Sequence, residues 1–397
     1  MDSMRTIIVM HCFSYIYDGG QETFILKTFK YIKQNSSRRF LFIIVSLVDE
    51  QNPKLVKAYE DAGIKLIRLN FKNRNLGLID LYANLKQLLK LSNEVRREKV
   101  DILYGHDFFS AFIVRVTYLL CFLKGYRIRK LYISLHNLLF WLKPTHHLIN
   151  RFLALFTDKI ICVSQSVLKF SLNTDKINLN KYEVIYNGID TEEYKYDLIN
   201  RNELRKEYGI SENTFVFGAI GSISFRKGHL FLIKAFKKFQ ETHPDSLLVI
   251  FGGYREIDGD LEIKSEVENY ITLHKLNERI RILKPRLDIK KAYSMFDVYV
   301  MPSVVEGFGL SLVEAMSCES IIIASDIPPF MEILEDNHNA LLFKSQDVSD
   351  LESKLYETYE LSTARKLTMG KNARLSVVEK FNSKLMGENY ARLYELS

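Results

Sequence analysis

Short β-rich apolar runs alternate with longer helical patterns from the first residues to the last third of the chain. This alternation predicts parallel sheets covered by helices on both faces, because strands buried on both faces read as continuous apolar runs. The expected fold class is therefore α/β with doubly wound sheets. The expected strands are Thr6–His11, Phe40–Ser46, Lys65–Leu69, Ile102–Tyr104, Leu131–Leu135, Lys159–Val163, Tyr182–Ile185, Phe215–Ile220, Leu247–Phe251, Arg281–Leu283, Val298–Met301, Ile321–Ala324 and Ala340–Phe343.

Two domains are expected in a chain of 397 residues, because one hydrophobic core rarely grows to that size. The turn-forming segment Asn187-Gly188-Ile189-Asp190 predicts the boundary between them. We expect a first domain over residues 1–190 and a second over 191–379, with the last helix, 380–397, packing back on the first. Two such domains facing each other would form a cleft at the carboxyl ends of their strands, where ligands bind in open α/β sheets.

The net charge of +7 is unevenly distributed along the chain. Residues 1–190 hold 28 Lys and Arg against 16 Asp and Glu, a net of +12, whereas residues 191–397 hold 27 against 32, a net of −5. A basic first half suits an anionic lipid surface, an acidic glycan or nucleic acid. A basic surface without any partner explains the same composition equally well.

The cysteines and the apolar segments bear on the location of the protein. The four cysteines contain no Cys-x-x-Cys pair, so neither a disulfide framework nor a zinc site is indicated. Ile7–Met10 is too short for a signal peptide, and Phe108–Leu123 is interrupted by Arg115. We expect no transmembrane segment and a cytoplasmic protein, either free or peripheral on the inner face of the membrane.

A strand, a glycine-containing loop and a helix follow one another within Val300–Cys318. Gly307 and Gly309 allow the backbone to approach a ligand closely. The backbone amides of Phe308, Gly309 and Leu310, at the positive end of the helix dipole, form an anion site. A diphosphate would suit this site.

Two carboxylates, Glu306 and Glu314, belong to the same segment, one in the loop and one in the helix. They are too far apart in sequence to be adjacent on one helical face, so they would contact different parts of one ligand. A carboxylate accepts hydrogen bonds from neighbouring hydroxyls, which sugars offer. A favourable Glu near a helix start and an exposed Glu on an amphipathic helix explain the pair equally well.

The pattern Glu-x-Phe-Gly-x4-Glu, with Asp297–Ser303 before it and Ala315–Cys318 and Ile323–Asp326 after it, resembles the signature of the family-4 retaining glycosyltransferases. This resemblance implies the GT-B fold, in which two Rossmann-like domains face each other across a cleft. In that family the first Glu binds hydroxyls of the donor sugar and the second binds the nucleotide ribose. The resemblance therefore assigns these roles to Glu306 and Glu314.

The segment Phe217–Leu230 resembles the diphosphate-binding loop of the same family. The family lysine is Lys227 here, but the position of the family arginine is occupied by Ser222. Arg226, directly before the lysine, is a candidate for the missing charge. Read alone, an Arg-Lys-Gly sequence at a helix start is a solvated loop.

Three further segments of the first half resemble family features. Gly19 and Gly20 match the Gly-Gly loop after the first strand, where the sugar phosphate and the acceptor approach, although a tight turn explains them as well. His136 resembles the strand-end histidine that reaches the donor sugar. His106 resembles a histidine on the acceptor side, and both also read as simple caps of strand ends.

Two departures from the family pattern lie after the Glu pair. The usual Cys-Gly is Cys318-Glu319, and the usual Gly-Gly before a later Glu is Pro328-Pro329. Both are expected to alter the donor pocket. The pair His146-His147 has no carboxylate at ligand spacing, so no metal site is predicted.

The expected function is retaining transfer of a hexose from a nucleotide-diphosphate sugar, with UDP favoured over GDP, to a hydroxyl of a glycan or lipid-linked acceptor. The resemblance implies surface polysaccharide or lipopolysaccharide biosynthesis and no metal or other cofactor. An epimerase or hydrolase of the same fold is one alternative, and a catalytically silent basic binding module is another. The Glu pair argues against silence, and no single segment interleaves aromatic and basic residues, so no nucleic acid is expected.

Overall fold

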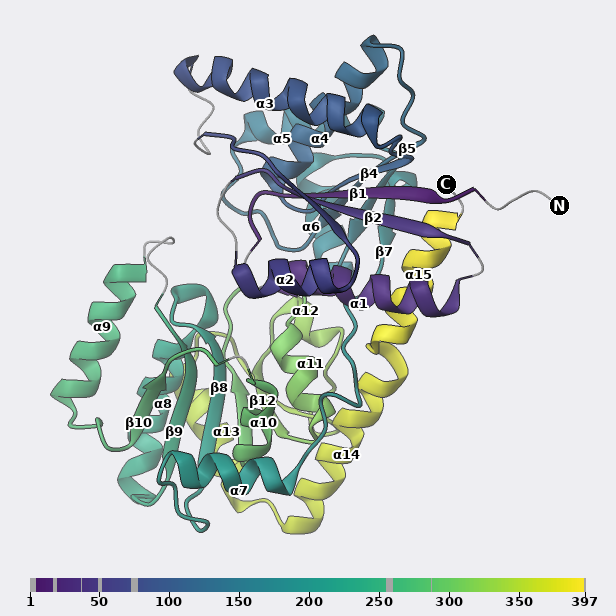
Figure 1. Ribbon diagram of the computed structural model, residues 1–397. Helices are drawn as coiled ribbons and strands as arrows, with labels where there is room; N and C mark the ends of the chain where they lie inside the picture. The colour runs from purple at the N-terminus through teal and green to yellow at the C-terminus, as the bar shows by residue number, and fades with distance from the viewer. Residues whose placement is uncertain are drawn as a thin grey trace. The chain divides into compact units, whose positions relative to one another are not determined.

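The computed structural model describes residues 5–16, 20–36, 38–48, 52–72, 78–254, 260–286 and 288–395. The chain divides into two compact units (Figure 1). Unit 1 comprises Met1–Gly188 with Ser383–Ser397, and unit 2 comprises Ile189–Asn382. Each unit is an α/β layer structure with one parallel sheet. Every strand expected from the sequence is present, with its ends within two residues of the expected places, and the α/β prediction is confirmed.

The sheet of unit 1 has seven parallel strands in the order β3-β2-β1-β4-β5-β6-β7. The second and third strands of the chain therefore lie in order on one side of β1, and the later four lie in order on its other side. This is the doubly wound pattern. In chain order the strands are β1 (Ile7–Phe13), β2 (Phe40–Ser46), β3 (Lys65–Arg68), β4 (Ile102–Gly105), β5 (Lys130–Leu135), β6 (Lys159–Cys162) and β7 (Tyr182–Val184).

Helices cover both faces of this sheet, because its strands are apolar toward both sides. One core lies between the sheet and α1, α2 and α15, and the other between the sheet and α3 and α4. The helices are α1 (Gly20–Asn35), α2 (Pro53–Asp61), α3 (Leu78–Arg97), α4 (Phe108–Leu123), α5 (Pro144–Leu153), α6 (Gln165–Asp175) and α15 (Ser383–Glu395), with 3-10 turns η1 (Ala154–Phe156) and η2 (Leu179–Lys181).

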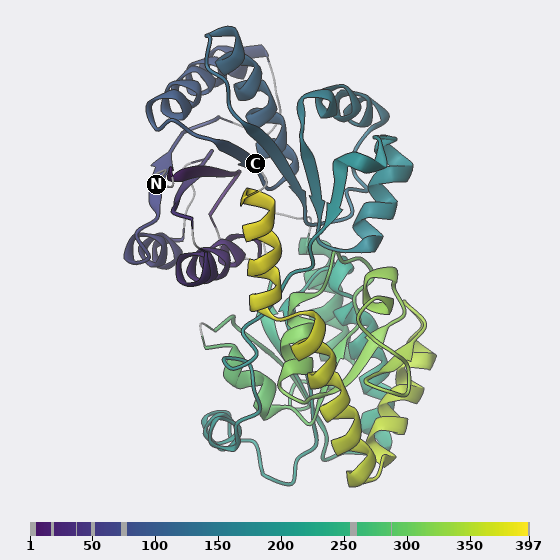
Figure 2. The same ribbon diagram turned by 90° about the vertical axis from the view of Figure 1, so that its right-hand side faces the viewer.

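The last helix, α15, packs against α1 in unit 1 (Figure 2). A Cβ atom at Gly387 would lie 2.4 Å from the ring of Tyr31, so the absent side chain permits this close approach. The Tyr132 hydroxyl on the sheet donates to the Leu393 carbonyl at 3.3 Å. The ring of Tyr394 completes the contact and lies in the same core as β1 and β2.

The sheet of unit 2 has six parallel strands in the order β10-β9-β8-β11-β12-β13. Asp297 connects its two central strands, because its carboxylate accepts from the Val216 amide at 2.7 Å and pairs with Arg201 and Arg205. In chain order the strands are β8 (Val216–Ser222), β9 (Leu247–Gly253), β10 (Ile280–Leu283), β11 (Val298–Met301), β12 (Ile321–Ser325) and β13 (Leu341–Phe343).

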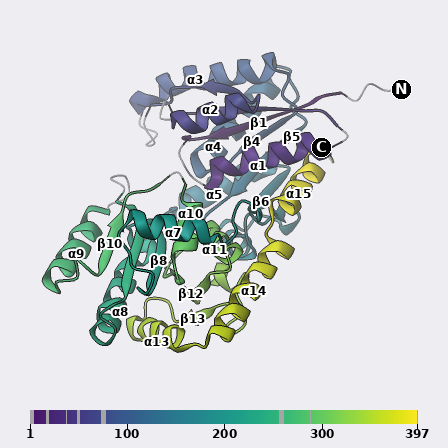
Figure 3. The ribbon, with the colours of Figure 1, turned by 60° about the horizontal axis from the view of Figure 1, so that its bottom comes forward.

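Helices α8 and α13 pack side by side on the sheet of unit 2 (Figure 3). The helices of this unit are α7 (Leu198–Glu207), α8 (His229–Thr242), α9 (Asp260–Leu273), α10 (Lys290–Met295), α11 (Leu310–Ser317), α12 (Pro328–Met331), α13 (Val348–Glu360) and α14 (Thr363–Lys380), with a 3-10 turn η3 (Phe225–Lys227). Among the residues with described positions, no helix combines the length and the apolar character needed to cross a bilayer.

Candidate active site

Two loops of unit 2 leave the carboxyl ends of the paired strands β8 and β11 and touch each other. Gly228 ends the first loop with φ of +68°, and a Cβ atom there would lie 1.9 Å from the Pro302 carbonyl oxygen in the second. The Val304 amide donates to the Arg226 carbonyl at 2.8 Å. Only glycine fits at position 228, and its small size allows the side chains of the two loops to meet.

Lys227 and Glu306 form the centre of this arrangement. Lys227 Nζ lies 2.5 Å from Glu306 Oε1, and both side chains are largely removed from solvent. Ser303 Oγ donates to the same carboxylate oxygen at 3.1 Å. Ser325 Oγ in turn donates to the Ser303 carbonyl at 2.5 Å, so a hydrogen bond from β12 holds the loop in place. The structure thus brings together two residues that were predicted from separate segments of the sequence.

Glu314 lies in α11 and has its own tyrosine partners. The Tyr293 hydroxyl donates to Glu314 Oε2 at 2.6 Å. Burial, and then the negative charge of Glu314, raise the pKa of Tyr293 well above its usual value, so this hydroxyl keeps its proton. Burial and Glu314 also raise the pKa of Tyr194, whose ring centroid lies 6.1 Å from that of Tyr293. Glu314 is thereby held by tyrosines, whereas Glu306 is held by Lys227 and Ser303.

Arg226 and Ser222 lie on the same loop but differ in environment. The Arg226 side chain is exposed in the middle of the 3-10 turn, whereas Ser222 ends β8 opposite Gly253. The neighbouring His229 is buried, and its Nδ1 has no hydrogen-bond partner among the described residues. Burial and the nearby Lys227 lower the pKa of His229 to about 3, so this imidazole is neutral.

The start of α11 is shaped by Gly309 and Phe330. Gly309 has φ of +105° and a Cβ atom there would lie 2.8 Å from the Phe330 ring. Leu310 is the first residue of the helix, and the buried Phe308 ring packs edge-on against Phe381 at 5.5 Å between centroids. The prolines Pro328-Pro329, which depart from the family pattern, begin α12 and place Phe330 against this helix start. This departure therefore affects the packing of the candidate donor loop.

In unit 1 three histidines from neighbouring strands form a row. His11 Nδ1 lies 2.8 Å from His106 Nε2, and His106 Nδ1 lies 3.4 Å from His136 Nε2. The rings of Phe13 and Tyr104 stack on His106, each at 4.4 Å between centroids. The sequence selected His106 and His136, and the structure joins them and adds His11.

All three imidazoles are neutral at physiological pH. Burial lowers the pKa values of His11 and His136 to about 3 and that of His106 well below its usual range. The Nε2 atom of His11 is buried without a partner among the described residues. Buried unpaired N–H groups are rarer than unpaired acceptors, so His11 donates from Nδ1 to His106, and His106 donates from Nδ1 to His136. His136 then carries its proton on Nδ1.

The row is anchored at the carboxyl end of β4 by Asp107. Its carboxylate accepts from the Ser14 amide at 2.8 Å and from the Ser110 amide at 2.9 Å, and so it caps α4 and holds the end of β1. Gly20 is the first residue of α1, whereas Gly19 lies outside the described residues. The predicted Gly-Gly loop is therefore placed only in part.

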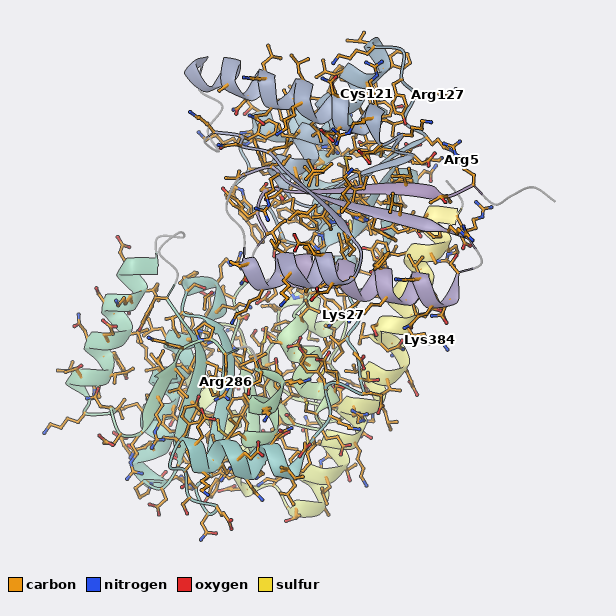
Figure 4. All side chains as sticks on the ribbon, viewed as in Figure 1. Arg5, Lys27, Cys121, Arg127, Arg286 and Lys384 are labelled. Carbon is orange, nitrogen blue, oxygen red and sulfur yellow. The ribbon has the colours of Figure 1, made fainter. Side chains whose placement is uncertain are left out.

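A basic depression of about 580 Å³ lies at the opposite edge of the unit 1 sheet. Figure 4 shows Arg5 and Arg127 at the same end of this unit. Arg5, Asp101 and Arg129 each precede a strand, which places them at the amino ends of β1, β4 and β5. His106 and His136 lie at the carboxyl ends, so this basic depression is separate from the predicted acceptor side.

Two expectations about residues near the site need correction. Glu319 lies beyond the carboxyl end of α11, about 12 Å along the helix from its start, so it alters a helix end rather than the donor loop. His147 does have a carboxylate partner, because its Nδ1 lies 2.6 Å from Asp175 Oδ1 in α6. In the part of the chain that the structure describes, no group of three or more His, Cys, Asp or Glu side chains is arranged to hold a metal ion.

Sequence reasoning missed several members of these clusters. His11, Tyr293 and Tyr194 were not selected, because each contacts a predicted site residue from a distant part of the chain. One signal was available for His11. A histidine near the end of a buried apolar strand interrupts the pattern in the same way as His106 and His136 do.

Two family models match the chain in turn. Residues 19–193 match the model of Glycosyltransferase Family 4, and residues 200–376 match that of Glycosyl transferases group 1. Together these segments include the histidines of unit 1 and both loops of unit 2.

Several glycosyltransferases are similar to the chain over most of their length. The chain is 26% identical over 333 residues to a UDP-Gal:alpha-D-GlcNAc-diphosphoundecaprenol alpha-1,3-galactosyltransferase of Escherichia coli, covering 82% of each chain. It is 28% identical over 312 residues to the N-acetyl-alpha-D-glucosaminyl L-malate synthase of Bacillus anthracis, covering 77% of each. A capsular polysaccharide biosynthesis glycosyltransferase of Staphylococcus aureus is 25% identical, covering 80% of this chain and 82% of its own.

Solved structures share the fold at lower identity. The Anabaena protein HepE, solved with UDP and glucose, superposes with a TM-score of 0.83 at 21% identity, covering 98% of this chain and 99% of its own. A glycosyltransferase of Rickettsia africae has a TM-score of 0.81 at 20% identity, covering 99% and 98%. The two matched models, the Glu pair with its lysine, and these neighbours agree, and the chain therefore belongs to the family-4, group 1 glycosyltransferases of GT-B fold.

Proposed function

We propose that this glycosyltransferase moves a hexose from a nucleotide-diphosphate sugar to a hydroxyl of a glycan or lipid-linked acceptor, with retention of anomeric configuration. The observation that carries the proposal is the contact of Lys227 with Glu306 beside the start of α11. A cation suited to phosphate, a carboxylate suited to sugar hydroxyls and a helix amino terminus lie close together there, which supports the proposal. Glu314, the proposed ribose ligand, lies one helix turn further on.

In the proposed reaction the bond between the anomeric carbon and the phosphate oxygen breaks, and the acceptor oxygen bonds to the same face of that carbon. The departing phosphate oxygen takes the acceptor proton, so no side chain acts as a nucleophile. Lys227, Arg226 and the amides of Phe308, Gly309 and Leu310 stabilise the charge that develops on the diphosphate. Each such donor is worth about 3 kcal/mol in comparable sites.

His136 takes part as a neutral hydrogen-bonding group. Because burial lowers its pKa to about 3, it contributes no positive charge at neutral pH. Its contact with His106 assigns the proton to Nδ1, so the His136 ring is a hydrogen-bond donor. We propose that this donor orients the sugar and that His106 faces the acceptor side.

We propose a UDP-sugar as donor, with a GDP-sugar as the alternative. The Escherichia coli relative is named for UDP-Gal and for a diphosphoundecaprenol-linked acceptor, which supports a UDP-sugar donor and a lipid-linked acceptor here. The Staphylococcus aureus relative is named for capsular polysaccharide biosynthesis, which supports a role in surface polysaccharide or lipopolysaccharide biosynthesis. A lipid-linked acceptor would bring the protein to the inner face of the cytoplasmic membrane. We further propose that no metal or other cofactor is required, because the basic side chains named above compensate the phosphate charge.

A thermal-shift screen with UDP, GDP, ADP and their sugars tests the donor, because a ligand bound to the folded state raises its stability by mass action. The stabilising sugar nucleotide is then incubated with acceptor in the presence of EDTA, and the anomeric coupling of the product is read by NMR. Transfer with retention supports the proposal. Breakdown of the sugar nucleotide at the same rate without acceptor would instead identify a hydrolase or epimerase.

A further inference from the structure

Helix α5 of unit 1 is turned with its polar face inward. His147 Nδ1 lies 2.6 Å from Asp175 Oδ1, and Asn150 Nδ2 donates to the other oxygen of that carboxylate at 3.2 Å. Arg115, buried in α4, donates to Asn150 Oδ1 at 2.5 Å. An amphipathic helix on a globular domain normally packs its apolar face on the core. Here a hydrogen-bonded network occupies that place, and the apolar face is left outside.

The outward side chains of this helix and of the loop before it form one apolar surface. Leu148, Phe152 and Leu155 are four and three positions apart, which places them along one side of the helix and its extension. Phe140 packs against Phe170 of α6, with 4.8 Å between ring centroids. We call this group the α5 surface; its members, each between 46% and 69% exposed, are Phe140, Trp141, Leu148, Ile149, Phe152 and Leu155.

The surroundings of the α5 surface are basic. Residues 138–181 contain six Lys and Arg and two carboxylates, Asp158 and Asp175. Asp175 is buried in the network beneath α5, and Asp158 pairs with Lys130 and accepts from the Leu131 amide. The cations Lys143 and Arg151 are exposed on or beside the helix. Apolar side chains bordered by exposed cations suit an interface of acyl chains and anionic headgroups.

We propose that the α5 surface docks unit 1 on an anionic lipid bilayer, with its apolar side chains in the headgroup and upper acyl region and Lys143 and Arg151 at the phosphates. The partner is a lipid surface rather than a second protein, because acyl chains match the apolar side chains and anionic headgroups match the basic border. This inference deepens the proposed membrane location and rests on the proposed function only for its biological purpose. It is measured without donor or acceptor, so its failure leaves the transfer reaction standing.

The only tryptophan of the chain, Trp141, lies in this surface and reports on it directly. Full-length protein is titrated with vesicles of phosphatidylcholine containing one third phosphatidylglycerol. The Trp141 emission is expected to shift to shorter wavelength, and bilayers with brominated acyl chains are expected to quench it. Raising the salt from 0.05 M to 0.5 M should weaken binding at least about tenfold, because surface charges are then screened.

A double variant, Leu148→Ser with Phe152→Ser, removes two outward side chains and leaves the inward network intact. It is expected to lower vesicle partitioning at least about tenfold without a change in melting temperature. The matched control is Leu273→Ser with Leu367→Ser, which removes two comparably exposed apolar side chains from unit 2. The control should partition like the unchanged protein.

Three outcomes would overturn the proposal. The first is no shift of Trp141 emission with anionic vesicles, and the second is equal losses in the two double variants. The third is a blue shift that grows with protein concentration in the absence of lipid, together with a dimer by light scattering that Leu148→Ser with Phe152→Ser abolishes. That result would assign the α5 surface to a second copy of the chain.

Discussion

Lys227 and Glu306 are 79 residues apart in sequence and meet with 2.5 Å between Nζ and Oε1. The contact depends on the close approach of the two loops at Gly228 and on Ser303, which also bonds the carboxylate. The proposed phosphate ligand and the proposed sugar ligand therefore form an ion pair with each other. Both side chains are held in place by this contact, and we expect donor binding to exchange it for contacts with the phosphate and the sugar.

The pair predicts separable effects of its two members. Glu306→Ala is expected to lower transfer by at least about 10³-fold while the folded state persists, because the hydroxyl contacts proposed for it disappear. Glu306→Gln, which keeps the shape and loses the charge, should fall between. Lys227→Met should lower kcat by about 10²- to 10³-fold. Steady-state transfer assays with circular dichroism as the folding control measure these values, and near-native turnover of Glu306→Ala would remove Glu306 from the mechanism.

Gly228 predicts a steric effect that is distinct from backbone strain. Gly209 has a similar positive φ of +60° but nothing within 4 Å of the Cβ position, so Gly209→Ala isolates the strain, about 1–2 kcal/mol. Gly228→Ala adds a clash with the Pro302 carbonyl, expected to cost about 1–3 kcal/mol more. Denaturant unfolding of the two variants gives the difference directly. Equal losses would mean that the two loops do not touch in solution.

Much of the fold followed from the sequence because buried parallel strands are continuous apolar runs. Val298–Met301, for example, has the bounds that its apolar run predicts. The sequence also predicted a strand, a loop and a helix around Glu306 and Glu314, and the structure contains this unit. The contacts of Tyr293 with Glu314 and of His147 with Asp175 could not be predicted, because they depend on how separate elements pack.

Tyr293 predicts a change in donor binding with little change in turnover. Its hydroxyl donates to Glu314 Oε2, so Tyr293→Phe should remove one of the hydrogen bonds that orient this carboxylate and raise KM for the donor about tenfold, equivalent to about 1.4 kcal/mol. Glu314→Ala should weaken donor binding more. Tyr356→Phe is the control, because that hydroxyl bonds the Lys238 carbonyl on α8. A fall in kcat with an unchanged KM would place Glu314 at the reacting sugar instead of the ribose.

Glu319 predicts that a substitution toward the family pattern stabilises the protein. Its φ of +58° is left-handed, a conformation that costs a residue with a Cβ atom about 1–2 kcal/mol. Glu319→Gly should therefore raise the free energy of unfolding by about 0.5–1 kcal/mol after the extra flexibility of glycine in the unfolded chain is subtracted. Glu319→Ala keeps the penalty and should give no gain. If alanine stabilised as much as glycine, the side chain and not the backbone would be the cause.

The neutral histidines predict loss of stability in mild acid. His11 has a pKa of about 3 in the folded protein, whereas the unfolded chain has the ordinary value of 6.5, so below pH 6.5 the unfolded state binds more protons. Stability is therefore complete above pH 6.5 and falls as the pH drops toward 3, by up to about 1.4 kcal/mol per pH unit for each such histidine. His106, His136 and His229 add to the slope in the same direction.

The variant His11→Phe separates this contribution from that of the carboxylates. Phenylalanine suits a site where the His11 ring stacks on Phe42 and Tyr104, and it removes one titrating group and the unpaired Nε2. Between pH 6.5 and 5, where ordinary carboxylates stay ionised, the unfolding free energy of this variant should fall less steeply, by up to about 1.4 kcal/mol per pH unit. The exposed His338→Gln should follow the unchanged protein. Equal slopes for the unchanged protein and both variants would show that His11 takes up its proton without unfolding. The assignment of neutral imidazoles to the row would then be wrong.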